Sequence, residues 1–180
     1  WVIDSILAPM QTGQTDVISA VYTEYYKKLY KYILYRVGDH NIAEDLVSEV
    51  FEKMLTYYST YDEEKSKFST WLFTIAHNTV INYHKKSQRR YTLALINCEK
   101  IESKHQLEEL IIDKELKEIL LRAIMALDER QQNIIAFKFG ARLTNREIAK
   151  ILNLTESNIG TILYRSLKRL RDILKEQGVV

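Results

Sequence analysis

Residues that interrupt helices are rare in this sequence, and this rarity constrains the fold more than any other feature. The chain has one proline, Pro9, and five glycines among its 180 residues. Apolar side chains recur every three to four residues over about 15–37 and 41–57, which is the period of a helix with one buried face. Gly38 and Asp39 separate these segments as a helix end and an N-cap. We therefore predict an all-α fold.

The composition is that of a water-soluble globular protein, with 46% hydrophobic and 28% charged residues. The single cysteine, Cys98, excludes an intrachain disulfide and a cysteine-based zinc cluster, and it fits a reducing compartment such as the cytoplasm. No run approaches the roughly 18 apolar residues of a membrane span, and the first ten residues lack the basic start of a signal peptide. Glycine-rich phosphate loops, metal-binding His/Glu pairs and nucleophile–base arrangements are also missing from the sequence. We expect no enzymatic activity, catalytic residue, cofactor or metal.

The net charge of +2 conceals two basic segments that are separated by an acidic one. Residues 65–98 contain no Asp or Glu, and neither do residues 157–171. Residues 99–118, between them, are rich in acidic side chains. Two separate basic surfaces indicate two contacts with a polyanion.

The segment 143–171 has the pattern of a helix-turn-helix, with a basic end on its second helix. Thr144 and Glu147 form a capping box at the start of the first helix. Asn153 suits the left-handed conformation of a tight turn, and Thr155 can cap the second helix. The side of the second helix that would face DNA carries Ser157, Asn158, Thr161, Tyr164, Arg165 and Lys168. A plain helical hairpin with solvated charges is the alternative interpretation.

Residues 68–90 predict a helix that combines a core face with a basic surface. The core face would consist of Phe68, Trp71, Leu72, Ile75, Ala76 and Thr79. His77 would lie on the other side, and Asn78 and Asn82 near the margin. Amide side chains beside aromatic rings and cations suit single-stranded nucleic acid, because bases stack on rings and hydrogen-bond along their edges. A solvated basic helix is the alternative, and His77 and His84 lack a third ligand for zinc.

The predicted helix at about 41–57 has an acidic face opposite its apolar one. That face carries Asp45, Ser48, Glu49 and Glu52. Carboxylates repel a polyanion, so a protein partner is the natural use of this face. A solvated helix surface is the alternative.

Taken together, three blocks resemble a bacterial RNA polymerase sigma factor of the small, two-domain extracytoplasmic-function (ECF) type. The family's helix that docks on the clamp helices of RNA polymerase is matched by NIAEDLVSEVFEKML, residues 41–55. The segment that binds and opens the −10 element is matched by residues 68–90. The domain that reads the −35 element is matched by residues 127–171. The blocks occur in the family's order and spacing, over roughly residues 15–175.

The resemblance implies two small helical domains joined by a linker. The N-terminal domain would be residues 1–90, the linker 91–106 and the helix-turn-helix domain 107–180. The implied partners are RNA polymerase core enzyme, promoter DNA and an anti-sigma factor. The implied function is promoter-specific initiation of transcription, by a protein that is not itself an enzyme.

The resemblance also gives roles to individual residues. Asn78 and Asn82 would contact bases of the −10 element, with residues 59–67 helping to form the pocket. The residues that would hold the DNA backbone there are Lys85, Lys86, Arg89 and Arg90. The acidic face of residues 45–52 would bind core polymerase, and the exposed side of the second helix of the helix-turn-helix would read the −35 element.

The sequence departs from the family pattern at several positions. Ser48 stands where the docking helix usually carries Gln, and Asn153 where the turn commonly has Gly. Gly160 and Ile162 stand where the recognition helix often carries basic residues, so we expect weaker phosphate contacts at the −35 element.

Two other functions are compatible with parts of the sequence. A free-standing helix-turn-helix regulator would explain residues 143–171 but leave residues 41–90 unused. A helical interaction protein, or a degenerate family member that no longer acts in transcription, would bind only a protein partner.

Overall fold

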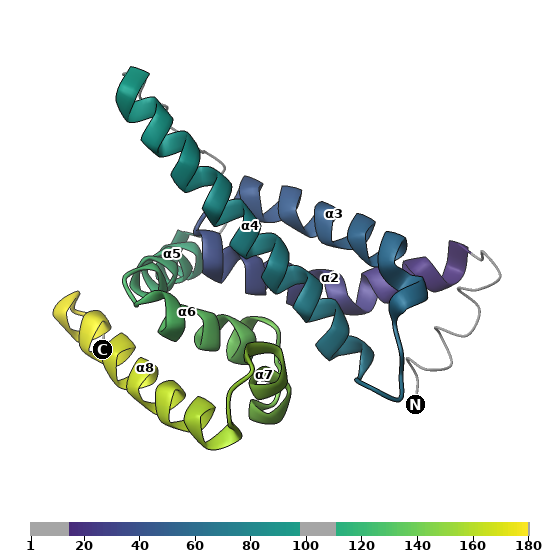
Figure 1. Ribbon diagram of the computed structural model, residues 1–180. Helices are drawn as coiled ribbons and strands as arrows, with labels where there is room; N and C mark the ends of the chain where they lie inside the picture. Colours follow the sequence, from purple (N-terminus) through teal and green to yellow (C-terminus); the bar gives the residue numbers. More distant parts are fainter. Residues whose placement is uncertain (1–14, 98–110, 180) are drawn as a thin grey trace.

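The computed structural model describes residues 15–97 and 111–179, and this part of the chain contains helices and no strands. The predicted all-α fold is confirmed (Figure 1). The helices are α2 Thr15–Val37, α3 His40–Tyr57, α4 Phe68–Asn97, α5 Ile111–Met125, α6 Glu129–Ile135, α7 Asn145–Leu152 and α8 Glu156–Glu176. A 3₁₀ turn, η2 Tyr58–Thr60, follows α3, and a π-helical segment, η3 Ala136–Gly140, continues α6.

Some expectations from the sequence fall outside the described residues. They concern residues 1–14, Cys98, residues 99–106 of the expected linker and the start of the second domain at residue 107. The first part of the expected linker is helical, because α4 continues past residue 90 to Asn97.

The boundary between α2 and α3 forms as its residues predict. Gly38 has a φ of +72°, the left-handed conformation that ends α2. The Asp39 side chain then accepts a hydrogen bond of 3.0 Å from the backbone nitrogen of Ile42 and caps α3. One short connection therefore turns the chain back, so that α3 packs along α2.

Helices α2, α3 and α4 bury a shared apolar core. The α3 side of it is the predicted stripe, with Ala43 added and Ile42 half-buried. On α4, Phe73 and Val80 are fully buried, whereas Trp71 and Ile75 are only half-buried. The buried face of α4 is therefore turned slightly about the helix axis from the face that the sequence predicted. Phe73 contacts Tyr32 of α2 edge to face, with 5.7 Å between ring centroids.

The helices of the C-terminal part do not stand apart from this bundle. The main core continues from α2–α4 into η3, α7 and α8, and a smaller cluster joins α5, α6 and α8. In Figure 1, α6 and α7 lie between α8 and the α2–α4 bundle. The two parts joined by the linker thus share one core in this structure.

Gly140 marks the closest approach between the two parts. A Cβ atom at this position would lie 2.7 Å from the backbone nitrogen of Tyr32 and 2.8 Å from its Cα. Only glycine allows the end of η3 to pack directly against the backbone of α2. The Tyr32 ring stacks on Phe137 beside this contact, at 4.5 Å between centroids.

Candidate nucleic-acid interface

The helix-turn-helix forms through local hydrogen bonds at its caps, as its sequence predicts. The Thr144 backbone nitrogen donates to Oε2 of Glu147 at 2.9 Å, and the Glu147 backbone nitrogen donates to Oγ1 of Thr144 at 3.3 Å. Asn153 ends α7 in the left-handed conformation, at φ 53° and ψ 48°. Oγ1 of Thr155 accepts from the backbone nitrogen of Asn158 at 3.2 Å and caps α8. These caps set the direction in which α8 leaves the turn.

Helix α8 turns one side to the core and the other to solvent. Ile159, Ile162 and Ser166 are buried. The exposed side carries Ser157, Thr161, Tyr164, Arg165 and Lys168, and Asn158 lies half-buried beside them. All six residues predicted to face DNA therefore belong to one accessible face, and the helix ends in further exposed cations at Arg169 and Arg171.

Ile162, where the family often carries a basic residue, does not lie on the exposed side of α8. Its side chain is 9% exposed and packs in the core, because it lies one helical turn after the buried Ile159. At Gly160 an added Cβ would lie 3.9 Å from the Asn145 side chain, which is ordinary contact. The isoleucine therefore belongs to the core side of α8.

The predicted single-strand surface lies along the outer side of α4. Asn78 and Asn82, one helical turn apart, are both exposed, as are Lys85, Lys86 and Arg89. The side chain of Arg90 lies outside the described part. The amides and the cations thus follow one another along a continuous helix with no acidic residue among them.

Aromatic rings surround the start of this surface. The loop before α4 places Tyr61 next to Trp71, with 5.3 Å between ring centroids, and next to Phe68, at 5.5 Å. Tyr58 contacts Trp71 edge to face at 6.4 Å. In the same loop Lys65 pairs with Asp62 at 2.8 Å, and this hydrogen bond lowers the pKa of Asp62. The loop at residues 59–67 is therefore held against the N-terminal turns of α4.

The sequence suggested that His77 lies on the side of α4 opposite the core, but the structure places it against α2 and η3. Its Nδ1 lies 3.1 Å from the hydroxyl oxygen of Tyr32, and its ring lies 5.5 Å from that of Phe137. Burial and, to a smaller extent, the nearby charge of Arg36 lower the pKa of His77 to about 4, and the charge of Glu129 opposes this shift. The imidazole is neutral at pH 7 and belongs to the contact between the two parts of the chain.

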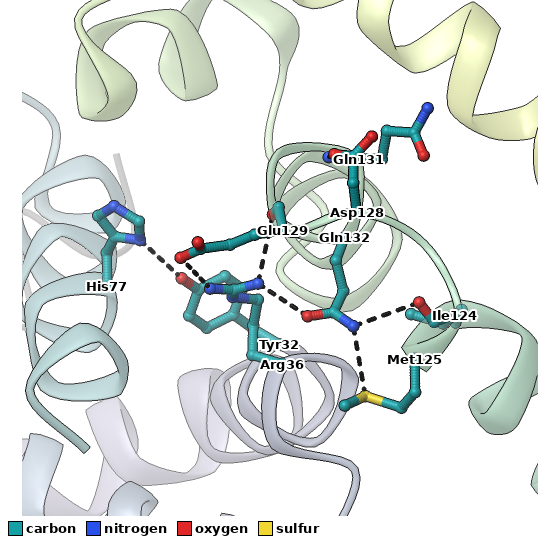
Figure 2. A network of polar contacts seen from close by, with 9 residues as sticks. All are labelled: Tyr32, Arg36, His77, Ile124, Met125, Asp128, Glu129, Gln131 and Gln132. Atoms are coloured by element: carbon teal, nitrogen blue, oxygen red, sulfur yellow. Dashed lines mark hydrogen bonds and ion pairs between the residues drawn. The ribbon is translucent and has the colours of Figure 1, made fainter. Parts of the chain in front are cut away.

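Arg36 is the buried charged residue at this contact, and sequence reasoning missed its role. The side chain is 1% exposed, and its Nη1 donates to Oε1 of Gln132 at 2.9 Å and to the Glu129 carbonyl at 3.4 Å (Figure 2). Gln132 in turn donates through Nε2 to the carbonyl of Ile124 at 3.3 Å. The sequence carried one sign of this burial, because Arg36 falls at a position of the helical pattern of residues 15–37 that is otherwise apolar. The pattern of one helix does not identify a partner as distant in sequence as Gln132.

The acidic face of α3 is accessible, with one exception. Asp45, Ser48 and Glu52 are exposed, whereas Glu49 is half-buried and pairs with Lys53. Lys53 also donates to Oγ1 of Thr79 at 3.1 Å, which ties this pair to α4. The large apolar side chains of Leu55 and Tyr57 are exposed at the end of the same region. The four predicted docking residues therefore lie together, beside apolar surface that a protein partner can cover.

No group of three or more His, Cys, Asp or Glu side chains in the described part of the chain could hold a metal ion. None of its helices is long and apolar enough to cross a membrane.

Comparison with known proteins connects these surfaces to one family. The sequence matches the family model "Sigma-70 region 2" over residues 21–90 and "Sigma-70, region 4" over residues 117–170. The first match covers most of the α2–α4 bundle, and the second covers α7 and most of α8.

Curated relatives align along most of the chain. ECF RNA polymerase sigma factor BldN of Streptomyces coelicolor is 31% identical over 171 residues, covering 93% of this chain and 64% of the relative. ECF RNA polymerase sigma factor SigM of Bacillus subtilis is 28% identical over 168 residues, covering 90% and 97%.

A solved structure supports the fold. Sigma factor RpoE, in complex with the anti-sigma factor NepR from Bartonella quintana, superimposes with a TM-score of 0.67 and 20% sequence identity. The superposition covers 87% of this chain and 97% of that one. With both sigma-70 regions matched in order and ECF sigma factors aligned along nearly the whole sequence, the chain belongs to the ECF group of the sigma-70 family of RNA polymerase sigma factors.

Proposed function

We propose that this chain binds core RNA polymerase and directs it to specific promoters through its −10 and −35 elements. The observation that carries this proposal is the presence of three accessible surfaces of different chemistry on one chain. They are the acidic face of α3, the amide and basic face of α4, and the exposed side of α8. A free-standing DNA-binding regulator would have a use for only the last of them.

The α8 surface is suited to duplex DNA. An exposed helix after a capped turn can enter the major groove, where Ser157, Asn158 and Thr161 can hydrogen-bond with base edges. Arg165 and Lys168 lie farther along the same helix, where cations contact phosphates and fix the register. This division of base and phosphate contacts supports recognition of the −35 element.

The α4 surface is suited to a separated strand. Asn78 and Asn82 can hydrogen-bond with an unstacked base, and the cations after them can hold its phosphates. Capture of an unpaired base shifts the melting equilibrium toward the open form, against an unstacking cost of a few kcal/mol per base. Promoter opening of this kind requires no catalytic residue, so the chain acts as a non-enzymatic subunit.

The proposed partners follow from the remaining surface and from the relatives. The acidic face of α3 and the adjoining Leu55 and Tyr57 would dock on a complementary surface of core polymerase. RpoE of Bartonella quintana is bound by an anti-sigma factor, and we propose the same class of inhibitor for this chain. Its site of action would be the cytoplasm, with the polymerase.

The test is transcription by purified core polymerase on a broad promoter pool, with and without this chain, followed by sequencing of the transcripts. We expect new start sites that share sequence motifs near −10 and −35. Core polymerase with a variant that lacks the α8 contacts, Arg165→Ala with Lys168→Ala, is the matched control. Unchanged start sites with the wild-type chain would overturn the proposal. Tight, specific promoter binding by the chain alone would favour the free-standing regulator instead.

A further inference from the structure

A small basic cavity lies beside the loop before α4 and the start of α7. Its volume is about 250 Å³, just below the roughly 300–1,000 Å³ of pockets for drug-sized ligands. The residues that line it are Lys67, Thr70, Thr144, Arg146, Glu147 and Lys150. None of the surfaces named in the proposed function includes the cations of this cavity, so they are free for another ligand.

The cations on the lining come from two elements. Arg146 and Lys150 lie four residues apart on α7, so they share one side of the helix, with about 5–6 Å between their Cβ atoms. Lys67 comes from the loop before α4. All three side chains are exposed and can turn toward a ligand that enters from solvent. Cations spaced in this way can each hold a separate negative group.

Glu147 also lines the cavity, but its carboxylate is already engaged. Oε2 accepts hydrogen bonds from the backbone nitrogen of Thr144 at 2.9 Å and from Oγ1 of Thr144 at 2.7 Å. Oε1 lies 3.4 Å from Nζ of Lys67 and 3.5 Å from Oγ of Ser69. Burial raises the pKa of Glu147, but the hydrogen bonds from Thr144 and the charge of Lys67 lower it by more. The carboxylate is therefore ionised, and the lining, with three cations, keeps a net positive charge.

The rest of the lining also favours a charged, oxygen-rich ligand. Thr70, in the first turn of α4, is only 6% exposed and still lines the cavity, so the cavity reaches below the surface. Thr144 caps α7, and the peptide dipoles at the start of a helix favour negative charge. Among the described residues, no aromatic or large apolar side chain lines the cavity. A ligand would therefore be held through its charges.

We propose that this cavity binds an oligophosphate, a short chain of phosphoryl groups that is either free or carried by a nucleotide. Arg146 and Lys150 would hold successive phosphoryl groups, and Lys67 would turn from Glu147 to the ligand. A single phosphate would leave part of this cation set unused. The site goes beyond the proposed function, because oligophosphate binding requires neither promoter DNA nor polymerase.

Isothermal titration calorimetry on the full chain, without DNA, polymerase or magnesium, tests the site. The probes are tripolyphosphate, ATP, orthophosphate and adenosine, at an ionic strength of about 0.15 M to screen distant charges. We expect saturable binding of one tripolyphosphate or one ATP per chain, much weaker binding of orthophosphate, and none of adenosine. Equal affinities for tripolyphosphate and ATP would assign the site to the phosphate chain alone, and tighter binding of ATP to a nucleotide. Lack of saturable binding by both, or orthophosphate binding as tight as that of tripolyphosphate, would overturn the proposal.

Variants without charge locate the site. Arg146→Gln with Lys150→Gln should weaken tripolyphosphate binding about tenfold, because two ion pairs with the ligand are lost. Arg122→Gln with Lys175→Gln is the matched control, since it makes the same change in net charge at exposed positions on α5 and α8. The control should leave the affinity nearly unchanged. Equal weakening by the two pairs would mean diffuse attraction to a basic protein and would overturn the site.

Glu147 gives a test in the opposite direction. Glu147→Gln removes a repelling charge and releases Lys67, and glutamine can still complete the capping box with Thr144. Tripolyphosphate should bind severalfold more tightly, whereas the exposed control Glu176→Gln should change little. Unchanged or weaker binding by Glu147→Gln, with its helix content intact by circular dichroism, would contradict the proposal.

Promoter DNA provides the last arm of the test. If Arg146→Gln with Lys150→Gln keeps its affinity for tripolyphosphate but weakens holoenzyme binding to promoters, these cations contact DNA and the oligophosphate site is refuted. The titrations use the chain alone, so their outcome is independent of whether the chain directs transcription.

Discussion

The hydroxyl oxygen of Tyr32 lies 3.1 Å from Nδ1 of His77, which joins α2 to α4 directly beside the C-terminal part. The ring of His77 lies 5.5 Å from Phe137 of η3, and Tyr32 stacks on the same phenylalanine. Burial raises the pKa of Tyr32 and lowers that of His77, so each group is held in its neutral form. Protonation of His77 is therefore linked to the packing of this region.

We predict that acid weakens the folded state through His77. The pKa of this residue is about 4 in the folded chain, against an ordinary value of 6.5. Between these values the unfolded chain binds the proton and the folded chain does not. The free energy of unfolding should thus be fully maintained above pH 6.5 and fall as the pH drops toward 4, by up to about 3 kcal/mol. Urea denaturation over this range measures the loss.

His77→Gln separates this contribution from the other titrating groups. Glutamine can still accept a hydrogen bond from Tyr32 but does not titrate. Burial also lowers the pKa of His84, so that residue and the carboxylates should leave a shallower slope in the variant. Identical slopes in the two proteins would show that His77 does not carry the effect.

The exposed amides of α4 give a kinetic prediction. Asn78→Ala and Asn82→Ala should slow formation of the open promoter complex by roughly twofold to tenfold each, because a trapped base loses a hydrogen bond worth roughly 0.5–1.5 kcal/mol. Initial binding to duplex promoter should change little, since the α8 surface is intact. Permanganate reactivity of unpaired thymines over time measures opening, and Gln177→Ala is an exposed-amide control. Equal losses in binding and opening would argue against strand trapping.

Charge reversal tests the acidic face of α3. Asp45→Lys combined with Glu49→Lys should abolish co-purification with core polymerase, because cations replace carboxylates at the proposed contact. Glu115→Lys with Glu176→Lys makes the same change in net charge at exposed positions on α5 and α8 and should retain binding. Circular dichroism establishes that both variants fold. Equal retention by the two variants would rule out this face as the docking site.

Features that depend on neighbouring residues could be predicted from the sequence. The caps at Asp39, Thr144 and Thr155 each bond with a backbone nitrogen three residues later, and the helix-turn-helix follows from them. The exposed positions on α8 likewise follow from helical period. The same period places Ile159 and Ile162 on the core side of α8, where both are buried.

Features that depend on distant residues could not be predicted. Arg36 and Gln132 are 96 positions apart, and only the packing of α6 on α2 brings them within 2.9 Å. Gly140 appeared as one of five glycines, with nothing local to indicate that a helix backbone lies against it. His77 was assigned to the solvent side of α4 because the C-terminal part, which covers it, was expected to be a separate domain.

The exposed cations of α8 give a prediction in salt dependence. Arg165→Ala with Lys168→Ala should weaken holoenzyme binding to promoters and reduce the slope of log affinity against log salt by about 0.9 for each lost phosphate contact. The loss should be nearly the same for different −35 sequences, because phosphates carry no sequence information. Arg122→Ala with Lys175→Ala removes two exposed cations elsewhere and should leave the slope unchanged. Weakened binding with an unchanged slope would mean that Arg165 and Lys168 do not contact phosphates.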